Sequence, residues 1–413
     1  MTMRSSGAED AKKTFRAAYS AAFNEKSIDG MMDSIAAFAE SIGRSMAEEY
    51  RSMSQSERLD AEALRARGIR PLSARETRYY SAVIDAMKHR NGGEVKSALE
   101  GLTETMPETV LDQVMEDIKT EFPLLSEIDF VNASYMTSWI YNKQGRQFAT
   151  WGNLGDKIKG ELQASFGKLS ATQCKLTAYM VISFDWLDLG PAWLDRYIRA
   201  VLVEASGMSM ELAIVDGEGN RDGAPCPIGM TRDLDKGTTA DELTTYARKT
   251  AVVLTDLSPK TYGNLLASLA KTPTGRSRPV SNVLMVVNPL DYLTLVMPAT
   301  TMMTPSGTYV SNVLPVPTRI VQSEAVPAGH AVVGLAKQYI GLLGAAKHNA
   351  NSKAGVITYD DSVFWMDDAR VYKTRLLANG RPKDNASFVY CDISGLEPLA
   401  WVPGVVSTTE TGG

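Results

Sequence analysis

Apolar residues in the first quarter of the chain recur every three or four positions, which is the spacing of one face of an α-helix. The clearest stripe covers residues 28–46, and Ser27 stands directly before it as a helix N-cap. A second helix is predicted to begin at Ser73, where Glu76 completes a capping box. A third is predicted to begin at Pro107. We therefore predict that residues 8 to about 120 form a helical region separate from the rest of the chain.

After residue 130 the pattern changes to runs of β-branched and aromatic residues, which are typical of strands. Strands are predicted at residues 135–141 and 176–183. The segment between them, 142–175, is rich in Gly, Lys and Gln, and its spacing fits both a plain hairpin and a hairpin that carries a short helix. Periodicity alone leaves both readings open.

The longest predicted helix follows Gly190 and Pro191 and covers residues 191–215. At 1.5 Å per residue, its roughly 24 residues span about 36 Å, so it can serve as a spine for the molecule. Further elements are predicted with less regular spacing: capped helices at 239–254 and 259–270, short strands at 283–287, 313–320, 331–334 and 356–359, and a longer strand at 364–377. The pattern as a whole predicts an α+β fold.

Composition narrows the classes of function. The chain has 413 residues, enough for two or three domains, and its net charge is −5, from 43 basic and 48 acidic residues. No strong positive field draws it to nucleic acid, so sequence-specific DNA recognition is disfavoured. No apolar run is long enough to cross a membrane, and the first dozen residues lack the apolar core of a secretory signal. We expect synthesis and folding in a cytoplasm.

Candidate chemistry is sparse. Three isolated cysteines and three histidines show none of the spacings of a metal site or a catalytic triad, so we expect no metal, no cofactor and no enzymatic activity. The glycines in residues 216–222 follow a helix instead of preceding one, which favours a helix end over a phosphate or calcium loop. The Asp pairs at 360–361 and 367–368 are predicted to be solvated or to face other subunits. Cys226, between two prolines, is predicted to be an unreactive thiol.

Several segments of the sequence together resemble one family. They are PETVLDQVMEDIKTEFPLLSEIDF at 107–130, Trp151 with Gly152, DWLDLGPAWLDRYIRAVLVEASGMSMELAIVDGEG at 185–219, PIGM at 227–230, VVNPLDY at 286–292 and the run at 315–345. In this combination the chain is similar to the major capsid proteins of tailed bacteriophages, which have the HK97-like capsid fold. The resemblance covers roughly residues 105–400.

The resemblance implies a division of the chain into parts. These are a helical scaffold-like N-terminal region at 1–122, an N-terminal arm at 123–142, an extended loop at 143–178, a peripheral domain at 179–229 and 351–400 whose spine helix is 191–215, an axial domain at 230–350, and a flexible tail at 401–413. It also implies self-assembly into pentamers and hexamers of an icosahedral shell around double-stranded DNA, bound without sequence specificity. The shell would assemble in the host cytoplasm and form the virion capsid.

Further partners implied are a portal protein and, in some family members, a maturation protease and a decoration protein. No membrane is implied as a partner. Some members also cross-link a loop Lys to an Asn of a neighbour with the help of a Glu. The stretch 360–375 offers no matching Asn and Glu, so we expect no covalent cross-link. The candidate interface residues lie in the projecting segments and on the spine helix: Tyr135, Trp139, Trp151, Lys157, Lys159, Phe166, Lys168, Trp193 and Arg196.

Two alternatives to the capsid reading remain open. The first has the same fold: an encapsulin-like compartment that stores an enzyme. The second is a soluble enzyme whose site has no recognisable motif. A gene neighbourhood with portal and terminase genes favours the capsid over the compartment, and a monomer with a deep pocket favours the enzyme.

Overall fold

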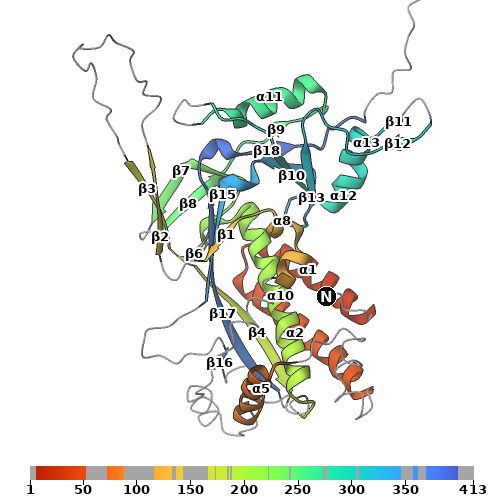
Figure 1. Ribbon diagram of the computed structural model, residues 1–413, viewed down its shortest axis with the longest axis vertical. Helices are drawn as coiled ribbons and strands as arrows, with labels where there is room; N and C mark the ends of the chain where they lie inside the picture. Colours follow the sequence, from red (N-terminus) through yellow and green to blue (C-terminus); the bar gives the residue numbers. More distant parts are fainter. Residues whose placement is uncertain are drawn as a thin grey trace, which may run out of the picture.

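The structure of the protein is a computed structural model. It describes residues 6–52, 72–87, 116–132, 136–142, 166–172, 174–183, 186, 188–221, 223–240, 243–272, 277–303, 307–345, 357–360 and 369–398. In that part of the chain the longest helix, α10, and the longest strand, β17, run along the same half of the molecule. The other half, beyond their upper ends in Figure 1, contains α11, α12, α13 and the sheet that includes β10.

The described helices are α1 (Ser6–Asn24), α2 (Ile28–Ser52), α5 (Ala74–Met87), α8 (Pro123–Ser126), α10 (Pro191–Asp216), α11 (Pro259–Ala270), α12 (Pro289–Asp291), the π-helical turn η1 (Tyr292–Val296), α13 (Met297–Thr300) and the 3₁₀ turns η2 (Ala336–Gln338) and η3 (Asn385–Ser387). Residues 116–121 are also helical. Three predicted caps are confirmed. The Ser27 hydroxyl accepts from the Gly30 amide, Ser73 and Glu76 bond reciprocally, and Ser258 caps α11.

The strands form two larger sheets and four hairpins. One sheet has the order β1 (Phe130–Asn132), β15 (Tyr339–Ala345), β17 (Ala369–Pro382), β16 (Ile357–Asp360), and β4 (Cys174–Ser183) also pairs with β17. The other has the order β13 (Thr318–Gln322), β10 (Val283–Val287), β14 (His330–Gly334), β18 (Phe388–Asp392), β9 (Val252–Val253). The hairpins are β2–β3 (Met136–Asn142, Phe166–Thr172), β5–β6 (Glu218–Arg221, Ala224–Ile228), β7–β8 (Arg232–Ala240, Leu243–Arg248) and β11–β12 (Met302–Met303, Tyr309–Val310).

The interior strand β10, which lies between β13 and β14, is buried on both faces, and its side chains belong to two hydrophobic clusters. Leu284 and Val286 belong to the cluster that contains α10, whereas Val283, Met285 and Val287 belong to the cluster beneath α11. Neighbouring side chains on a strand point to opposite faces, so one strand serves two cores. This explains why its sequence, VLMVV, shows no alternation of polar and apolar residues.

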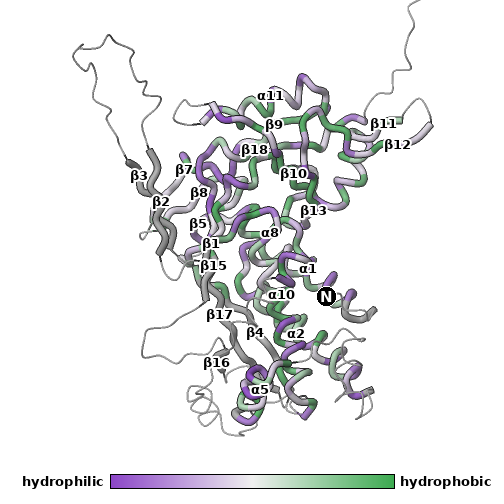
Figure 2. The backbone as a smooth tube through the Cα atoms, viewed as in Figure 1, coloured by the Kyte–Doolittle hydropathy of each residue, from purple (hydrophilic) through white to green (hydrophobic). Residues whose placement is uncertain are grey.

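The N-terminal helices are not a separate body, contrary to the expectation from sequence. Apolar residues of α1, α2 and α5 are buried in the same cluster as α10, and Figure 2 shows α1 and α2 beside α10, with α5 near its lower end. Close packing is visible at Gly43 of α2, where an added Cβ would lie 2.4 Å from the Trp186 ring. The amphipathic stripe that the sequence shows is therefore covered within the chain.

One predicted helix is wrong. Residues 239–254 were expected to be helical because Thr239 and Glu242 resemble a capping box, but the region forms the hairpin β7–β8 and the edge strand β9. The Thr239 and Thr244 hydroxyls lie 3.0 Å apart across the hairpin. The run of threonines, whose β-branched side chains favour strands, outweighs the helix-start signal.

Other predicted elements agree with the structure within a few residues. The helix predicted at 191–215 is α10, and the strands predicted at 283–287 and 331–334 are β10 and β14. The strand predicted at 313–320 begins later, at Thr318, and the long strand predicted at 364–377 is β17, shifted towards the C-terminus. The excursion at 142–175 begins and ends as an antiparallel hairpin, and its middle, 143–165, lies outside the described residues.

Candidate subunit interface

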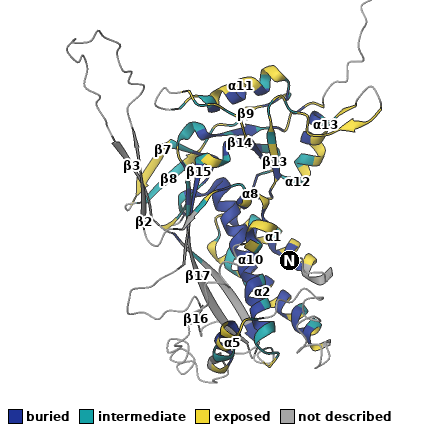
Figure 3. Ribbon diagram, viewed as in Figure 1, coloured by how far each residue is buried: buried dark blue, intermediate teal, exposed yellow. Residues whose placement is uncertain are grey.

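The largest concentration of exposed apolar side chains lies in one segment, residues 290–313. Among the described residues, eight of the eleven exposed large apolar side chains belong to it, and we call them the apolar tip: Leu290, Leu293, Met297, Met302, Met303, Tyr309, Val310 and Val313. They lie at one end of the half that contains α11, on α12, α13 and β11–β12, which Figure 3 shows as mostly exposed. A concentration of this kind on a soluble protein marks a contact surface.

Helical spacing produces the exposed face. Leu290, Leu293 and Met297 are three and four positions apart, so they share one side of the continuous helical segment formed by α12, η1 and α13. Val296 and Ala299 point to the other side and are buried in the core beneath α11. The segment is thus anchored by half of its apolar residues and exposes the other half.

Hydrogen bonds join the segment 290–313 to the body and hold it in shape. The Asp291 carboxylate accepts from the Gly329 amide of the body at 2.7 Å. Within the segment, the Tyr292 hydroxyl donates to the Asn312 side chain at 3.1 Å, and the Val313 amide donates to the Thr300 carbonyl at 2.9 Å. The exposed residues therefore belong to a defined surface and not to a loose loop. A preformed surface loses less conformational entropy on binding.

The hairpin β2–β3 is a second candidate contact. Trp139 pairs with Leu169 and Ile140 with Lys168 across its antiparallel ladder. In the described part of the chain the two strands form a sheet of their own, at the margin of the molecule in Figure 1. A two-stranded ribbon is marginally stable alone in water, so this one gains from any further surface that covers it.

The structure places the predicted interface residues in three ways. Tyr135, Trp151, Lys157 and Lys159 lie outside the described residues, and Trp139, Phe166 and Lys168 are placed by their backbone in β2 and β3. Trp193 and Arg196 on α10 instead contact the chain itself.

Trp193 is a core residue, which corrects its selection as an interface candidate. Its side chain is 1% exposed and stacks on Tyr197, with the ring centroids 5.2 Å apart and the planes 6° from parallel. Arg196 makes an ion pair with Glu49 of α2, at 3.0 Å between the nearest nitrogen and oxygen. Both were selected as residues of the spine helix, but that side of α10 is covered by the N-terminal helices and Trp186.

Buried charges, which sequence reasoning did not single out, join α10 to the N-terminal helices. Glu204 is fully buried, and its carboxylate accepts from Arg16 at 2.5 Å and lies 3.6 Å from the Lys12 ammonium. Burial raises the pKa of Glu204, although Arg16 and Lys12 oppose the shift. Lys12 also pairs with Glu121 at 2.6 Å. The available signal was an acidic residue inside the apolar stretch AVLVEA of α10.

A second buried network closes the C-terminal end of α10. Asp216, the last residue of the helix, accepts hydrogen bonds from Thr231 and Arg248 and lies 2.9 Å from the Arg232 guanidinium. Gly217 follows because an added Cβ would meet the Pro227 carbonyl oxygen at 2.2 Å. The Asp-Gly-Glu-Gly sequence thus ends a helix and starts a tight hairpin, as predicted.

The described residues hold no group of side chains suited to a metal ion. No described helix has the length and apolarity of a membrane span. Burial raises the pKa of Cys226, and raises that of Cys174 and Cys391 to about 12, so these thiols stay protonated at neutral pH. The pKa direction for Cys226 agrees with the expected unreactive thiol.

The apolar tip was not among the sequence predictions, although a signal for it exists. Between Pro289 and Val313 the only charged residue is Asp291. Segments depleted of charge are typical of the centres of protein interfaces. The same segment also reads as an ordinary core helix, and only the exposure of its side chains separates the two interpretations.

Comparison with known families now identifies the chain. The sequence model described as the Phage capsid family matches residues 103–309, half of the 413 residues. The chain belongs to the phage capsid family. The match begins ahead of α8 and ends in β12, so it includes α10, the β2–β3 hairpin and most of the apolar tip. The resemblance stated from the sequence is confirmed.

Solved structures similar to this capsid-family chain are capsids or particles. The Cyanophage A-1(L) capsid is 12% identical with a TM-score of 0.43, covering 66% of this chain and 92% of that one. The capsid of the native GTA particle is 15% identical with a TM-score of 0.41, covering 67% and 90%. The virus-like particle from Pyrococcus furiosus is 10% identical with a TM-score of 0.38, covering 68% and 98%. Curated proteins give no significant match.

Family membership fixes the coarse role. A phage capsid protein is a structural component of a shell, and the fold is the expected α+β class, the HK97-like capsid fold. The exposed tip is the kind of surface that a shell-forming protein presents to its neighbours.

Proposed function

We propose that this chain is the major capsid protein of a tailed bacteriophage, which assembles with copies of itself into pentamers and hexamers of an icosahedral shell around double-stranded DNA. The observation that carries the proposal is the family match over residues 103–309. The apolar tip supports it, because a single copy leaves these side chains exposed, and so does the β2–β3 ribbon, which pairs with no third strand among the described residues. The net charge of −5 is compatible with enclosed DNA that is not held by many phosphate contacts.

In this proposal the parts of the chain keep the division given above. The half that contains α11 and the apolar tip is the axial domain, at residues 230–350, and α10 is the spine of the peripheral domain. Residues 123–142 are the arm and 143–178 the extended loop, which includes β3 (Phe166–Thr172). A portal protein, a maturation protease and a decoration protein are the further partners proposed, with assembly in the host cytoplasm and a final place in the virion capsid.

The tip is proposed to pack between neighbouring copies. Its eight side chains carry no charge, so like charges do not repel where two copies meet. The contact also does not depend on ion pairs that salt would screen. Burial of apolar area is the energy source, since obligate interfaces of about 2,000 to 5,000 Å² are rich in such side chains.

The test is expression of the full chain alone, followed by sedimentation and negative-stain electron microscopy. We expect closed shells or capsomer rings from the unchanged chain. The double substitution Leu290→Glu and Tyr309→Glu should leave soluble subunits that do not associate, because two charges would have to be buried at each contact. A compact monomer under all salt and crowding conditions would contradict the proposal.

A matched control makes the same double change at exposed apolar residues outside the tip. Val252 and Val253 on the edge strand β9 are 45% and 63% exposed, so Val252→Glu with Val253→Glu adds the same two negative charges elsewhere on the surface. Assembly should survive this change. Loss of assembly in both variants would contradict the specific role of the tip, and shells that copurify with a folded enzyme would favour the compartment over the capsid.

A further inference from the structure

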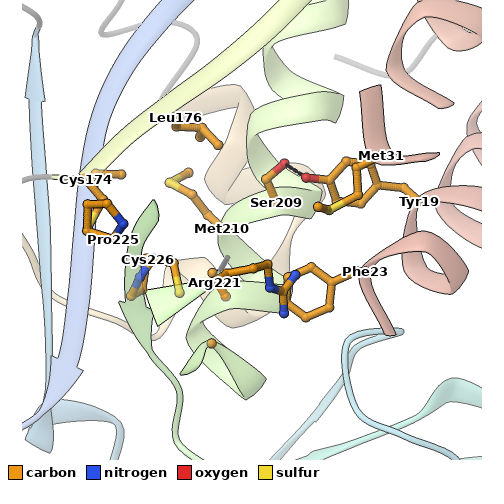
Figure 4. A pocket seen from close by; sticks show the side chains of 14 residues that line it. Tyr19, Phe23, Met31, Cys174, Leu176, Ser209, Met210, Arg221, Pro225 and Cys226 are labelled. Carbon is orange, nitrogen blue, oxygen red and sulfur yellow. Dashed lines mark hydrogen bonds between the residues drawn. The ribbon is translucent and has the colours of Figure 1, made fainter. Parts of the chain in front are cut away.

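A cavity of about 140 Å³ lies where the N-terminal helices meet α10, β4, β6 and β17 (Figure 4). Most of its wall is carbon and sulfur, contributed by Phe23 and Met31 from the N-terminal helices, Leu176 from β4 and Met210 from α10. Its polar part is formed by Ser209 with Tyr19, and by Arg221. The cavity is therefore apolar with a small polar region.

Arg221 is the unusual member of this wall. The residue is 9% exposed, and its guanidinium lies over the Phe23 ring, 3.6 Å from the ring centroid. Its Nε atom has no hydrogen-bond partner among the residues that the structure describes. Stacking uses the face of the guanidinium and leaves the N–H groups on its edge for an acceptor in the same plane. A buried donor of this kind is costly unless something accepts from it.

The other polar groups of the wall are already satisfied. The hydroxyls of Tyr19 and Ser209 bond to each other at 2.6 Å, and Ser209 also donates to the Ala205 carbonyl at 2.7 Å. These groups need no ligand, so an added polar group in the cavity would be drawn to Arg221.

The charges around Arg221 favour an anion. The cations in this network are Lys26, Arg221, Arg232 and Arg248, and the carboxylates are Asp216 and Glu218. Both carboxylates are engaged by the other three cations: Asp216 by Arg232 and Arg248, Glu218 by Lys26 at 3.0 Å and Arg232 at 3.6 Å. Four cations against two carboxylates leave a local excess of positive charge, and no carboxylate of the described residues lies within ion-pair distance of Arg221.

We propose that this cavity binds a small amphiphile, a compound with one aromatic or branched apolar body and one carboxylate. The apolar body would lie among Phe23, Met31 and Met210, and the carboxylate would accept from the edge of the Arg221 guanidinium, the geometry in which Arg binds carboxylates most strongly. The size fits, since an apolar cavity of about 150 Å³ accepts a benzene molecule. This site does not depend on shell assembly.

The site would also couple ligand binding to the N-terminal helices. Phe23 and Met31 belong to α1 and α2, whereas Met210 and Arg221 belong to the body, so a complete site exists only while the helices are docked. A ligand that binds only the docked state stabilises it. Occupancy would therefore delay any step in which the N-terminal helices leave α10.

The test uses isothermal titration calorimetry on the full chain with phenylacetate as the probe. We expect saturable binding of phenylacetate, at least tenfold weaker binding of the neutral phenylacetamide, and no saturable binding of acetate. The apolar body and the charge are then tested separately on the unchanged protein, so the result does not depend on whether a variant folds. Equal affinity for phenylacetate and phenylacetamide, or no binding of either, would overturn the proposal.

Two variants locate the binding. Ala213 on α10 lines the cavity, and Ala213→Leu should fill it and abolish binding of phenylacetate. Arg221→Met should remove the preference for phenylacetate over phenylacetamide. The matched control is Arg44→Met, which removes a guanidinium whose side chain is 66% exposed on α2, and should leave the affinity unchanged. Thermal unfolding of each variant shows whether it is folded, and unchanged affinity in folded Ala213→Leu protein would place the probe elsewhere and refute the site.

Discussion

Two apolar surfaces of this capsid protein have opposite fates. The face of α10 that the N-terminal helices cover contains buried charges as well as apolar side chains, and the buried carboxylate of Glu204 lies against the cations of Arg16 and Lys12. The apolar tip contains eight exposed side chains and no charge among them. Ion pairs make the covered surface specific for one partner, its own N-terminal segment. The eight side chains of the tip include no charge that could form such pairs.

The difference shows that charged and uncharged side chains suit different kinds of contact. A charge is tolerated in a core only where its partner is certain to be present, as it is within one chain. A surface that meets another copy must also stay soluble before the meeting, so its exposed apolar side chains are limited to one region and anchored by the buried half of the same helix. Each of the following changes should break or sharpen this contrast.

The largest effect is expected from deletion of residues 1–105. The deletion removes α1, α2 and α5 and uncovers the apolar side of α10 together with Glu204, whose cations are lost. We expect insoluble or misassembled subunits, measured by the soluble fraction and by electron microscopy. Supplying residues 1–105 as a separate polypeptide should restore part of the solubility. Correct shells from the truncated chain alone would show that the cover is dispensable.

Glu204→Ala is the point change that removes most from the covered surface. It leaves Arg16 partly buried without its carboxylate, while Lys12 keeps Glu121, and removal of one partner of a buried pair costs about 3 to 5 kcal/mol. The free energy of unfolding, measured by urea denaturation, should fall by about that amount. Glu40→Ala is the control, because Glu40 pairs with Arg44 on the exposed side of α2, and such pairs contribute less than about 1 kcal/mol. Equal losses in the two variants would contradict the contrast.

Glu211 gives the covered surface a dependence on pH. Burial raises the pKa of its carboxyl to about 7, opposed by a hydrogen bond from Ser323 and the charge of Arg16 and reinforced by Glu324, while the Leu124 backbone also faces it. Because the folded-state pKa is raised, the contribution of the neutral acid to stability is complete at low pH. It is lost as the pH rises from about 4.5 to about 7.

Glu211→Gln should remove this dependence. The amide stays neutral at every pH, so the variant should gain on the order of 2 to 3 kcal/mol relative to the unchanged chain between pH 5 and pH 8. Urea denaturation at several pH values measures the difference, with Glu40→Gln as the exposed control. A difference that does not change with pH would show that Glu211 keeps its ordinary pKa in the folded chain.

Sequence reasoning identified α10 and the caps of α2, α5 and α11 because those signals are local: a residue pattern and its cap lie within one turn of each other. It failed where distant contacts decide. The N-terminal helices were predicted to be a separate region because no local pattern in them shows that they pack on α10. Trp193 was predicted to be an interface residue for the same reason. The strand β8 (Leu243–Arg248) was mistaken for part of a helix at 239–254 because a capping box was given more weight than the threonines.

The candidate interface was predictable only in part, for a related reason. Large aromatic residues in the projecting segments were selected as interface candidates, while the run from Pro289 to Val313, whose only charged residue is Asp291, fits a buried helix equally well. Which side of that helix meets the core depends on residues far away in the sequence, such as Val283 in β10 and Val333 in β14. Periodicity gives a face and does not say whether another element covers it.

The smallest effect on the free subunit is expected at the tip. Leu290 is 72% exposed, so Leu290→Ser should change the free energy of unfolding of unassembled subunits by less than about 0.5 kcal/mol. Val296 lies on the buried side of the same helical segment, and Val296→Ser should cost about 2 to 4 kcal/mol, because it empties part of the core and buries a hydroxyl. The effect on assembly should differ in kind. Leu290→Ser should weaken association of subunits that are fully stable, whereas Val296→Ser should reduce assembly only because fewer subunits are folded. If Leu290→Ser instead destabilises the free subunit as much as Val296→Ser does, the tip is packed within its own chain and is no interface.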